Sequence, residues 1–137
     1  MPREKNPIKI LNEKVVAFDC DGTLVLWEED ISYWPKGAIF FPNPYYSPSP
    51  YTGTRGAGEY LVPHKKHIQK LKSYSKNGYF VIVWSMGGGP WAQSVVDTLE
   101  LNEYVDLIMP KPNICYDDMS IGNAFGERKF YKDKENK

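Results

Sequence analysis

The stretch VVAFDCDGTLV, residues 15–25, decides the fold class and places two carboxylates next to a strand. Its first part, Val15 to Phe18, is apolar and predicts a short buried strand. Asp19 and Asp21 follow at once, separated by one residue, and Gly22 permits a sharp turn. We therefore expect a pair of acidic groups at the carboxyl end of this strand.

The rest of the chain alternates the patterns of helices and strands. Apolar residues recur at helical spacing in two segments; Pro63 and Gly78 stand at the ends of the first, and the run Gly87 to Pro90 precedes the second. Continuous apolar runs such as YFVIVW are typical of buried strands. The segments expected to be helical are 63–76 and 91–101, and those expected to form further strands are 79–84, 104–109 and 114–116. This alternation predicts an α/β fold whose helices cover both faces of a central parallel sheet.

Polar residues stand at the ends of the predicted strands. They are Asp19, Ser85, Lys111 and Asp117. In open α/β sheets, ligands bind beyond the carboxyl ends of the strands. These four residues are therefore candidates for one site.

Residues 26–62 interrupt the alternation with a segment rich in Pro, Gly, Ser and aromatic residues. A loop of this length in a compact domain is usually functional or disordered, and its aromatic content favours a flap or small lid, partly β-hairpin. Arg55 is a candidate to clamp a substrate phosphate or stabilise the lid, or else a mobile loop residue. The aromatic residues either stack on a nucleobase or, as we favour, pack the flap on the domain: Trp34, Phe40, Phe41, Tyr45, Tyr46 and Tyr51.

Composition narrows the class of protein. The chain has 137 residues, which fits one domain, and a formal net charge of zero, which gives no global attraction to nucleic acid or an anionic membrane. Two cysteines in apolar surroundings favour a reduced, cytoplasmic setting over a disulfide framework. Neither a signal peptide nor a membrane-spanning run is recognisable, and residues 131–137 are expected to form a flexible tail.

The two carboxylates at the first strand end suit the chemistry of phosphate esters. Asp19 can coordinate a divalent cation and attack phosphorus, while Asp21 can protonate the leaving oxygen and then activate water. A calcium loop is the competing interpretation of Asp-x-Asp-Gly. It requires Glu where Asp30 stands, and the intervening residues are too apolar for an exposed metal loop.

Four segments together match the motifs of a known family. They are DCDGT after an apolar strand, VIVWS ending in Ser85, MPKP containing Lys111, and ICYDD containing Asp117 and Asp118. In this order and spacing the sequence resembles the haloacid dehalogenase-like (HAD) superfamily of phosphohydrolases, in particular small members without a large cap domain. The resemblance covers about residues 14–120 apart from the segment 26–62. With an acidic residue at Asp21, the sequence is similar to the phosphatases of this superfamily; the related dehalogenases and phosphonate hydrolases lack an acid at this position.

The resemblance implies a single three-layer, Rossmann-like domain over residues 1–137 that uses Mg²⁺. The implied catalytic residues are Asp19, Asp21 and Lys111; the implied phosphate-binding residues are Thr23, Ser85, Met86, Gly87 and Lys111; the implied metal ligands are Asp19, the backbone carbonyl of Asp21, Asp117 and Asp118. These roles meet a physical need, because a phosphoryl group in transit spreads negative charge over its oxygens.

The sequence thus predicts a magnesium-dependent phosphomonoesterase that forms an aspartyl-phosphate on Asp19 and uses Asp21 as general acid and base. Its substrate is left open between a small metabolite, a nucleotide and a nucleic-acid end, as is the oligomeric state. The alternatives are a non-catalytic phosphate-binding or scaffold module, a polynucleotide-end phosphatase, and phosphoryl transfer to an acceptor other than water. His64 and His67 are expected to lie with neighbouring lysines on a solvated basic face rather than to act as ligands.

Overall fold

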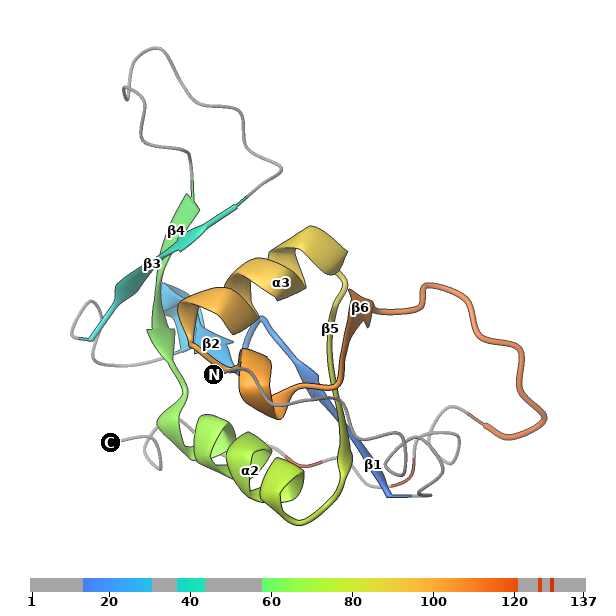
Figure 1. The fold of residues 1–137 in the computed structure, drawn as a ribbon. Helices are drawn as coiled ribbons and strands as arrows, with labels where there is room; N and C mark the ends of the chain where they lie inside the picture. The colour runs from blue at the N-terminus through green and yellow to red at the C-terminus, as the bar shows by residue number, and fades with distance from the viewer. Residues whose placement is uncertain (1–13, 31–36, 44–57, 121–125, 127–128, 130–137) are drawn as a thin grey trace.

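The computed structural model describes residues 14–30, 37–43, 58–120, 126 and 129. A parallel sheet has the strand order β1-β5-β6, and a smaller antiparallel sheet has the order β2-β4-β3 (Figure 1). The strands are β1 (Val15–Asp19), β2 (Val25–Leu26), β3 (Ile39–Pro42), β4 (Gly58–Pro63), β5 (Phe80–Ser85) and β6 (Leu107–Pro110). The helices are α2 (Lys65–Lys76) and α3 (Gly89–Thr98), with 3-10 turns η1 (Glu28–Asp30) and η2 (Asn102–Tyr104).

The register of the parallel sheet aligns the carboxyl ends of its strands. Asp19 at the end of β1 lies opposite Trp84, and Ser85 at the end of β5 lies opposite Pro110. Lys111 follows β6 directly, and its backbone N–H donates to the carbonyl of Ser85 at 2.9 Å. Three of the four strand-end candidates therefore lie along one edge of the sheet, as the sequence predicts.

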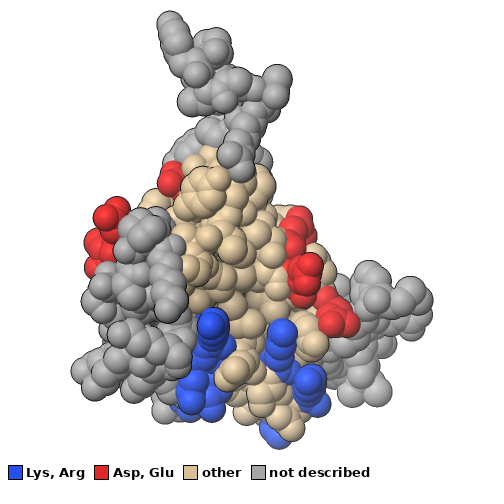
Figure 2. Space-filling view, turned by 90° about the vertical axis from the view of Figure 1, so that its left-hand side faces the viewer, with Lys and Arg blue, Asp and Glu red and all other residues tan. Residues whose placement is uncertain are grey.

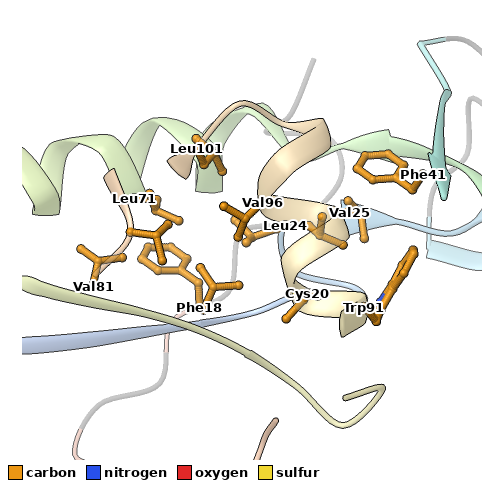
Figure 3. Close-up of a cluster of buried hydrophobic side chains, with 14 of the residues drawn as sticks. Phe18, Cys20, Leu24, Val25, Phe41, Leu71, Val81, Trp91, Val96 and Leu101 are labelled. Atoms are coloured by element: carbon orange, nitrogen blue, oxygen red, sulfur yellow. The ribbon is translucent and has the colours of Figure 1, made fainter. Parts of the chain in front are cut away.

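One face of the parallel sheet carries the main core. Val81 and Val83 of β5 and Phe18 of β1 are buried, whereas Val15 is 52 % exposed. Figure 3 shows the buried cluster between these strands and both helices, which lie on the same side of the sheet. The α/β class is therefore confirmed. A helical layer on the other face is not seen among the described residues, so the three-layer, Rossmann-like arrangement stays a prediction.

The helices and the third strand of the parallel sheet begin and end a few residues from their predicted bounds. Pro63 belongs to β4, and α2 starts at Lys65 because the side chain of His64 caps it by accepting the backbone N–H of His67. The helix predicted from residue 91 begins at Gly89, and the strand predicted from residue 104 begins at Leu107.

The strand predicted for residues 114–116 is wrong. This segment is irregular, with Ile114 77 % exposed and Tyr116 96 % exposed. The chain after β6 leaves the sheet as an extended excursion instead of adding a strand to it (Figure 1). Its apolar residues carry no packing partner in the sheet, which is why an apolar run alone misled the prediction.

The segment 26–62 is partly β structure, as predicted. β3 and β4 pair from Ile39–Leu61 to Pro42–Gly58. Phe41 is fully buried and meets Trp91 edge-on with ring centroids 6.4 Å apart, so this aromatic packs the segment on the domain. Phe40 meets Tyr60 edge-on across β3 and β4, with ring centroids 5.3 Å apart. The aromatic candidates Trp34, Tyr45, Tyr46 and Tyr51, the candidate Arg55 and the tail 131–137 lie outside the described residues.

None of the helices in the described part of the chain is both long and apolar enough to cross a bilayer.

Candidate functional site

The turn after β1 is held by its own backbone. The carbonyl of Cys20 accepts the N–H groups of Thr23, Leu24 and Val25 at 2.9–3.1 Å, and the N–H of Gly22 donates to the carbonyl of Val25 at 2.8 Å. Gly22 has φ +76°, a left-handed conformation that a side chain would strain. The turn therefore presents Asp19 and Asp21 from a fixed backbone.

Asp19 sits half-buried at the end of β1. Burial raises the pKa of its carboxyl group, while the charge of Lys111 and a hydrogen bond from the backbone N–H of Cys20 favour the ionised form and oppose that rise. Lys111 also lies 6.0 Å from the centre of the Trp84 ring. The structure thus brings the predicted nucleophile and the predicted cation into electrostatic contact.

Ser85 is 1 % exposed at the end of β5. Its hydroxyl oxygen accepts the backbone N–H of Gly87 at 2.9 Å, which leaves the hydroxyl hydrogen available to donate. The N–H of Gly87 is therefore engaged by Ser85, although the sequence suggested it for phosphate. Met86, the other predicted backbone donor, is 65 % exposed.

Asp21 points its carboxylate at two tryptophans. The indole N–H of Trp27 donates to Oδ1 at 2.9 Å and the indole N–H of Trp91 donates to Oδ2 at 3.3 Å. An open pocket with a volume of about 460 Å³ lies beside this carboxylate, lined by Asp21, Gly22, Trp27, Glu29 and Asp30. Sequence reasoning missed both tryptophans, because it took Trp27 only as too apolar for a metal loop and Trp91 only as the start of a helix.

Asp117 and Asp118 do not join the other acidic residues. Both are exposed in the segment after β6, and Oδ1 of Asp117 accepts the backbone N–H of Met119 at 2.8 Å, as in an Asx turn. Across the described ranges, no three side chains of His, Cys, Asp or Glu come together in a group that could hold a metal. The structure therefore supplies Asp19 and Asp21 at the sheet edge, while the role of the acidic pair stays a prediction.

The expectation that His64 and His67 lie on a solvated face is wrong. They are 0 % and 3 % exposed, with their rings stacked 3.8 Å apart. Nδ1 of His67 lies 2.7 Å from the carbonyl oxygen of Thr23, and since a carbonyl only accepts, Nδ1 must carry the hydrogen. The backbone N–H of His64 likewise donates to the carbonyl of Leu24 at 2.9 Å. The start of α2 is thus bonded to the turn after β1, and Thr23 makes its contact with the helix through its backbone carbonyl.

Lysines remain on the outer side of this helix. Figure 2 shows lysines gathered at the lower end of the face, at the level of α2 in Figure 1, with Asp and Glu higher on both flanks. The basic face expected for this helix is therefore made by lysines without the histidines.

Cys20 separates the two carboxylates and is fully buried. Burial raises the pKa of its thiol, and the charges of Asp21 and Asp19 raise it further. Cys115, the other cysteine, is exposed, and neither cysteine forms a disulfide.

No protein-family model, curated protein or solved structure matches the chain in the comparisons.

Proposed function

We propose that this chain is a magnesium-dependent phosphomonoesterase of the HAD type, with Asp19 as the nucleophile. The observation that carries the proposal is the position of Asp19: half-buried at the carboxyl end of β1, in contact with the charge of Lys111 and two residues from a second carboxylate. Ser85 at the end of the neighbouring strand adds a buried hydroxyl donor. Nucleophile, cation and donor at one sheet edge suit an anionic group that gains charge as it reacts.

The reaction then proceeds in two displacements. A carboxylate oxygen of Asp19 attacks phosphorus, the bond from phosphorus to the ester oxygen breaks, and Asp21 gives that oxygen a proton. Water next attacks the aspartyl-phosphate, Asp21 takes a proton from the water, and the bond between phosphorus and Asp19 breaks to release inorganic phosphate. Lys111 and Ser85 hold the phosphoryl oxygens in both steps.

The donor atoms at this edge are oxygens, which fits Mg²⁺, an ion that keeps several waters and needs few protein ligands. The Asp19 carboxylate and the Asp21 backbone carbonyl would hold it, and Asp117 and Asp118 are ligands proposed from the motif alone. When bound, the ion would neutralise part of the phosphate charge.

Within this class, small phosphate esters are the substrates we favour over polynucleotide ends. Two further acidic residues, Glu29 and Asp30, line the pocket beside Asp21. Further phosphates of a nucleic-acid chain would be repelled there, since like charges at short range cost free energy. A neutral leaving group meets no such penalty.

The test is hydrolysis of p-nitrophenyl phosphate and of a panel of small phosphate esters, with Mg²⁺ and with a chelator. We expect turnover that needs Mg²⁺ and falls at least about a thousandfold in Asp19→Asn, since nucleophile loss removes the covalent route. The matched control is Asp97→Asn, because Asp97 is an exposed carboxylate on α3 away from the strand ends. Equal activity in Asp19→Asn would refute covalent catalysis, and beryllofluoride binding without any turnover would favour a non-catalytic phosphate-binding module.

A further inference from the structure

The two indole groups on Asp21 come from different parts of the chain. Trp27 is six residues further along the chain, and its own backbone N–H donates to Oδ2 of Asp30 at 2.8 Å. Trp91 lies 70 residues from Asp21, in the first turn of α3. The Asp21 carboxylate therefore accepts one hydrogen bond from the segment directly after β2 and one from the helix that follows Ser85.

Trp91 has little freedom to move. It is 3 % exposed and packs edge-on against Phe41. A Cβ atom at Gly87 would lie only 2.9 Å from its Cδ1 atom, so the backbone passes directly against the indole. In Figure 3 its ring stands near Cys20 and Val25, next to the catalytic turn. A packed ring of this kind holds its N–H in a fixed direction.

An indole N–H can only donate, so each oxygen of Asp21 accepts one hydrogen bond from a tryptophan. Each carboxylate oxygen has two lone pairs, and one therefore remains on each for a proton in transit. Bonds from N–H donors to an ionised carboxylate are stronger than bonds between neutral groups. The pair can thus fix the plane of the carboxylate without blocking its exchange of protons.

We propose that Trp27 and Trp91 are positioning residues that hold Asp21 for general acid catalysis. The inference rests on the proposed phosphatase function. Neither indole takes part in a bond change; the pair sets the direction in which Asp21 gives its proton to the leaving oxygen. Precise orientation of a reacting group is worth a large part of catalysis, and a shift of about 1 Å costs up to a hundredfold in rate.

Leaving-group dependence is the measurement that separates positioning from general support of the fold. The esters are p-nitrophenyl phosphate, whose leaving phenolate needs little protonation, and glycerol phosphate, whose alkoxide leaving group needs a proton. kcat/KM reports the steps up to the aspartyl-phosphate, in which Asp21 acts as the acid. For Trp27→Phe and Trp91→Phe we expect kcat/KM on glycerol phosphate to fall at least about tenfold more than on the nitrophenyl ester, within the range of general acid catalysis.

The control is Leu71→Ala, a core change on α2 that removes packing without touching Asp21. It should lower kcat/KM on both esters by the same factor. Equal losses on the two esters in both tryptophan variants would overturn the proposal. Trp27 is only half-buried, so Trp27→Phe keeps the test open if Trp91→Phe fails to fold.

A second readout needs no activity. The chain has four tryptophans, and the ¹⁵N–¹H indole signals of Trp27 and Trp91 should both move in Asp21→Ala, while that of Trp84 serves as reference. Unmoved signals would overturn the contact itself. A wild-type protein that hydrolyses neither ester, yet shows the indole shifts, would refute the phosphatase function and leave the contact standing. An active wild type with equal losses would refute the positioning role alone.

Discussion

Replacing His67 tests how strongly the start of α2 stabilises the turn after β1. Nδ1 of His67 donates to the carbonyl of Thr23 at 2.7 Å, and the residue is 3 % exposed. His67→Leu leaves that carbonyl without this donor, a loss of about 1–3 kcal/mol in the free energy of unfolding. A stability of about 5–15 kcal/mol is usual for a domain, so the melting temperature should fall by several degrees.

His67→Asn is the matched variant, because an asparagine amide N–H can stand where Nδ1–H stands. It should keep the bond to Thr23 and lose the packing of the ring against His64. We expect it to recover at least half of the stability that the leucine variant loses. Thermal and urea unfolding followed by circular dichroism measure both.

The same residue gives stability a pH dependence with a definite sign. Burial lowers the pKa of His67 below its usual 6.5, the bond to Thr23 opposes that effect, and His64 lowers the pKa further. A depressed folded-state pKa means that the unfolded chain binds the proton more readily. The stabilising contribution is therefore complete above about pH 6.5 and declines as the pH falls through the folded-state pKa.

The assay is the difference in unfolding free energy between wild type and His67→Asn from pH 8 to pH 5. The wild type should lose its advantage over the variant as the pH falls, because other titrating groups are common to both. A difference that stays constant across this range, or a leucine variant as stable as the wild type, would contradict the assigned contacts.

Two further predictions concern the two ends of the sheet. The carboxylate of Asp106 accepts the backbone N–H of Val81 at 2.9 Å, so Asp106→Ala should lower the urea midpoint by the equivalent of about 1–3 kcal/mol. Asp106→Asn keeps an acceptor oxygen and should lower the midpoint less. Equal midpoints for the alanine variant and the wild type would be evidence against this bond. At the other end, a Cβ on Gly87 would meet Trp91 at 2.9 Å, whereas one on Gly89 first meets Pro110 at 3.5 Å. Gly87→Ala should therefore reduce hydrolysis of glycerol phosphate about tenfold or more, whereas Gly89→Ala should stay close to the wild type, and equal rates for the two would contradict the close approach.

The strands of the parallel sheet and the main site residues follow from local patterns. The runs at 15–18 and 79–84 are apolar because they form adjacent strands over the core, and the carboxylates and hydroxyl at their ends need no further information to be placed. Lys111 is predictable for the same reason, since it directly follows β6. The sequence motifs place these residues directly after the strands, and the register of the parallel sheet brings the strand ends together.

The burial of the histidines and the role of the tryptophans could not be predicted in this way. His67 is satisfied by Thr23, 44 residues away, and Trp91 reaches Asp21 over 70 residues. A polar side chain is buried only where a partner meets it, and the partner is set by tertiary packing. The prediction of a strand before Asp117 and Asp118 was wrong because this segment lies exposed after β6 and does not pair with the sheet.

Because Cys20 is buried, thiol reagents should modify the native protein at one cysteine. The thiolate is the form that reacts, and the raised pKa and full burial of Cys20 keep it from forming. The chain has one other cysteine, Cys115, which is exposed two residues before Asp117. A maleimide fluorophore would therefore attach to Cys115, beside the acidic pair, and leave Cys20 unmodified. Its emission during a Mg²⁺ titration would report whether that part of the chain approaches the sheet edge when the ion binds.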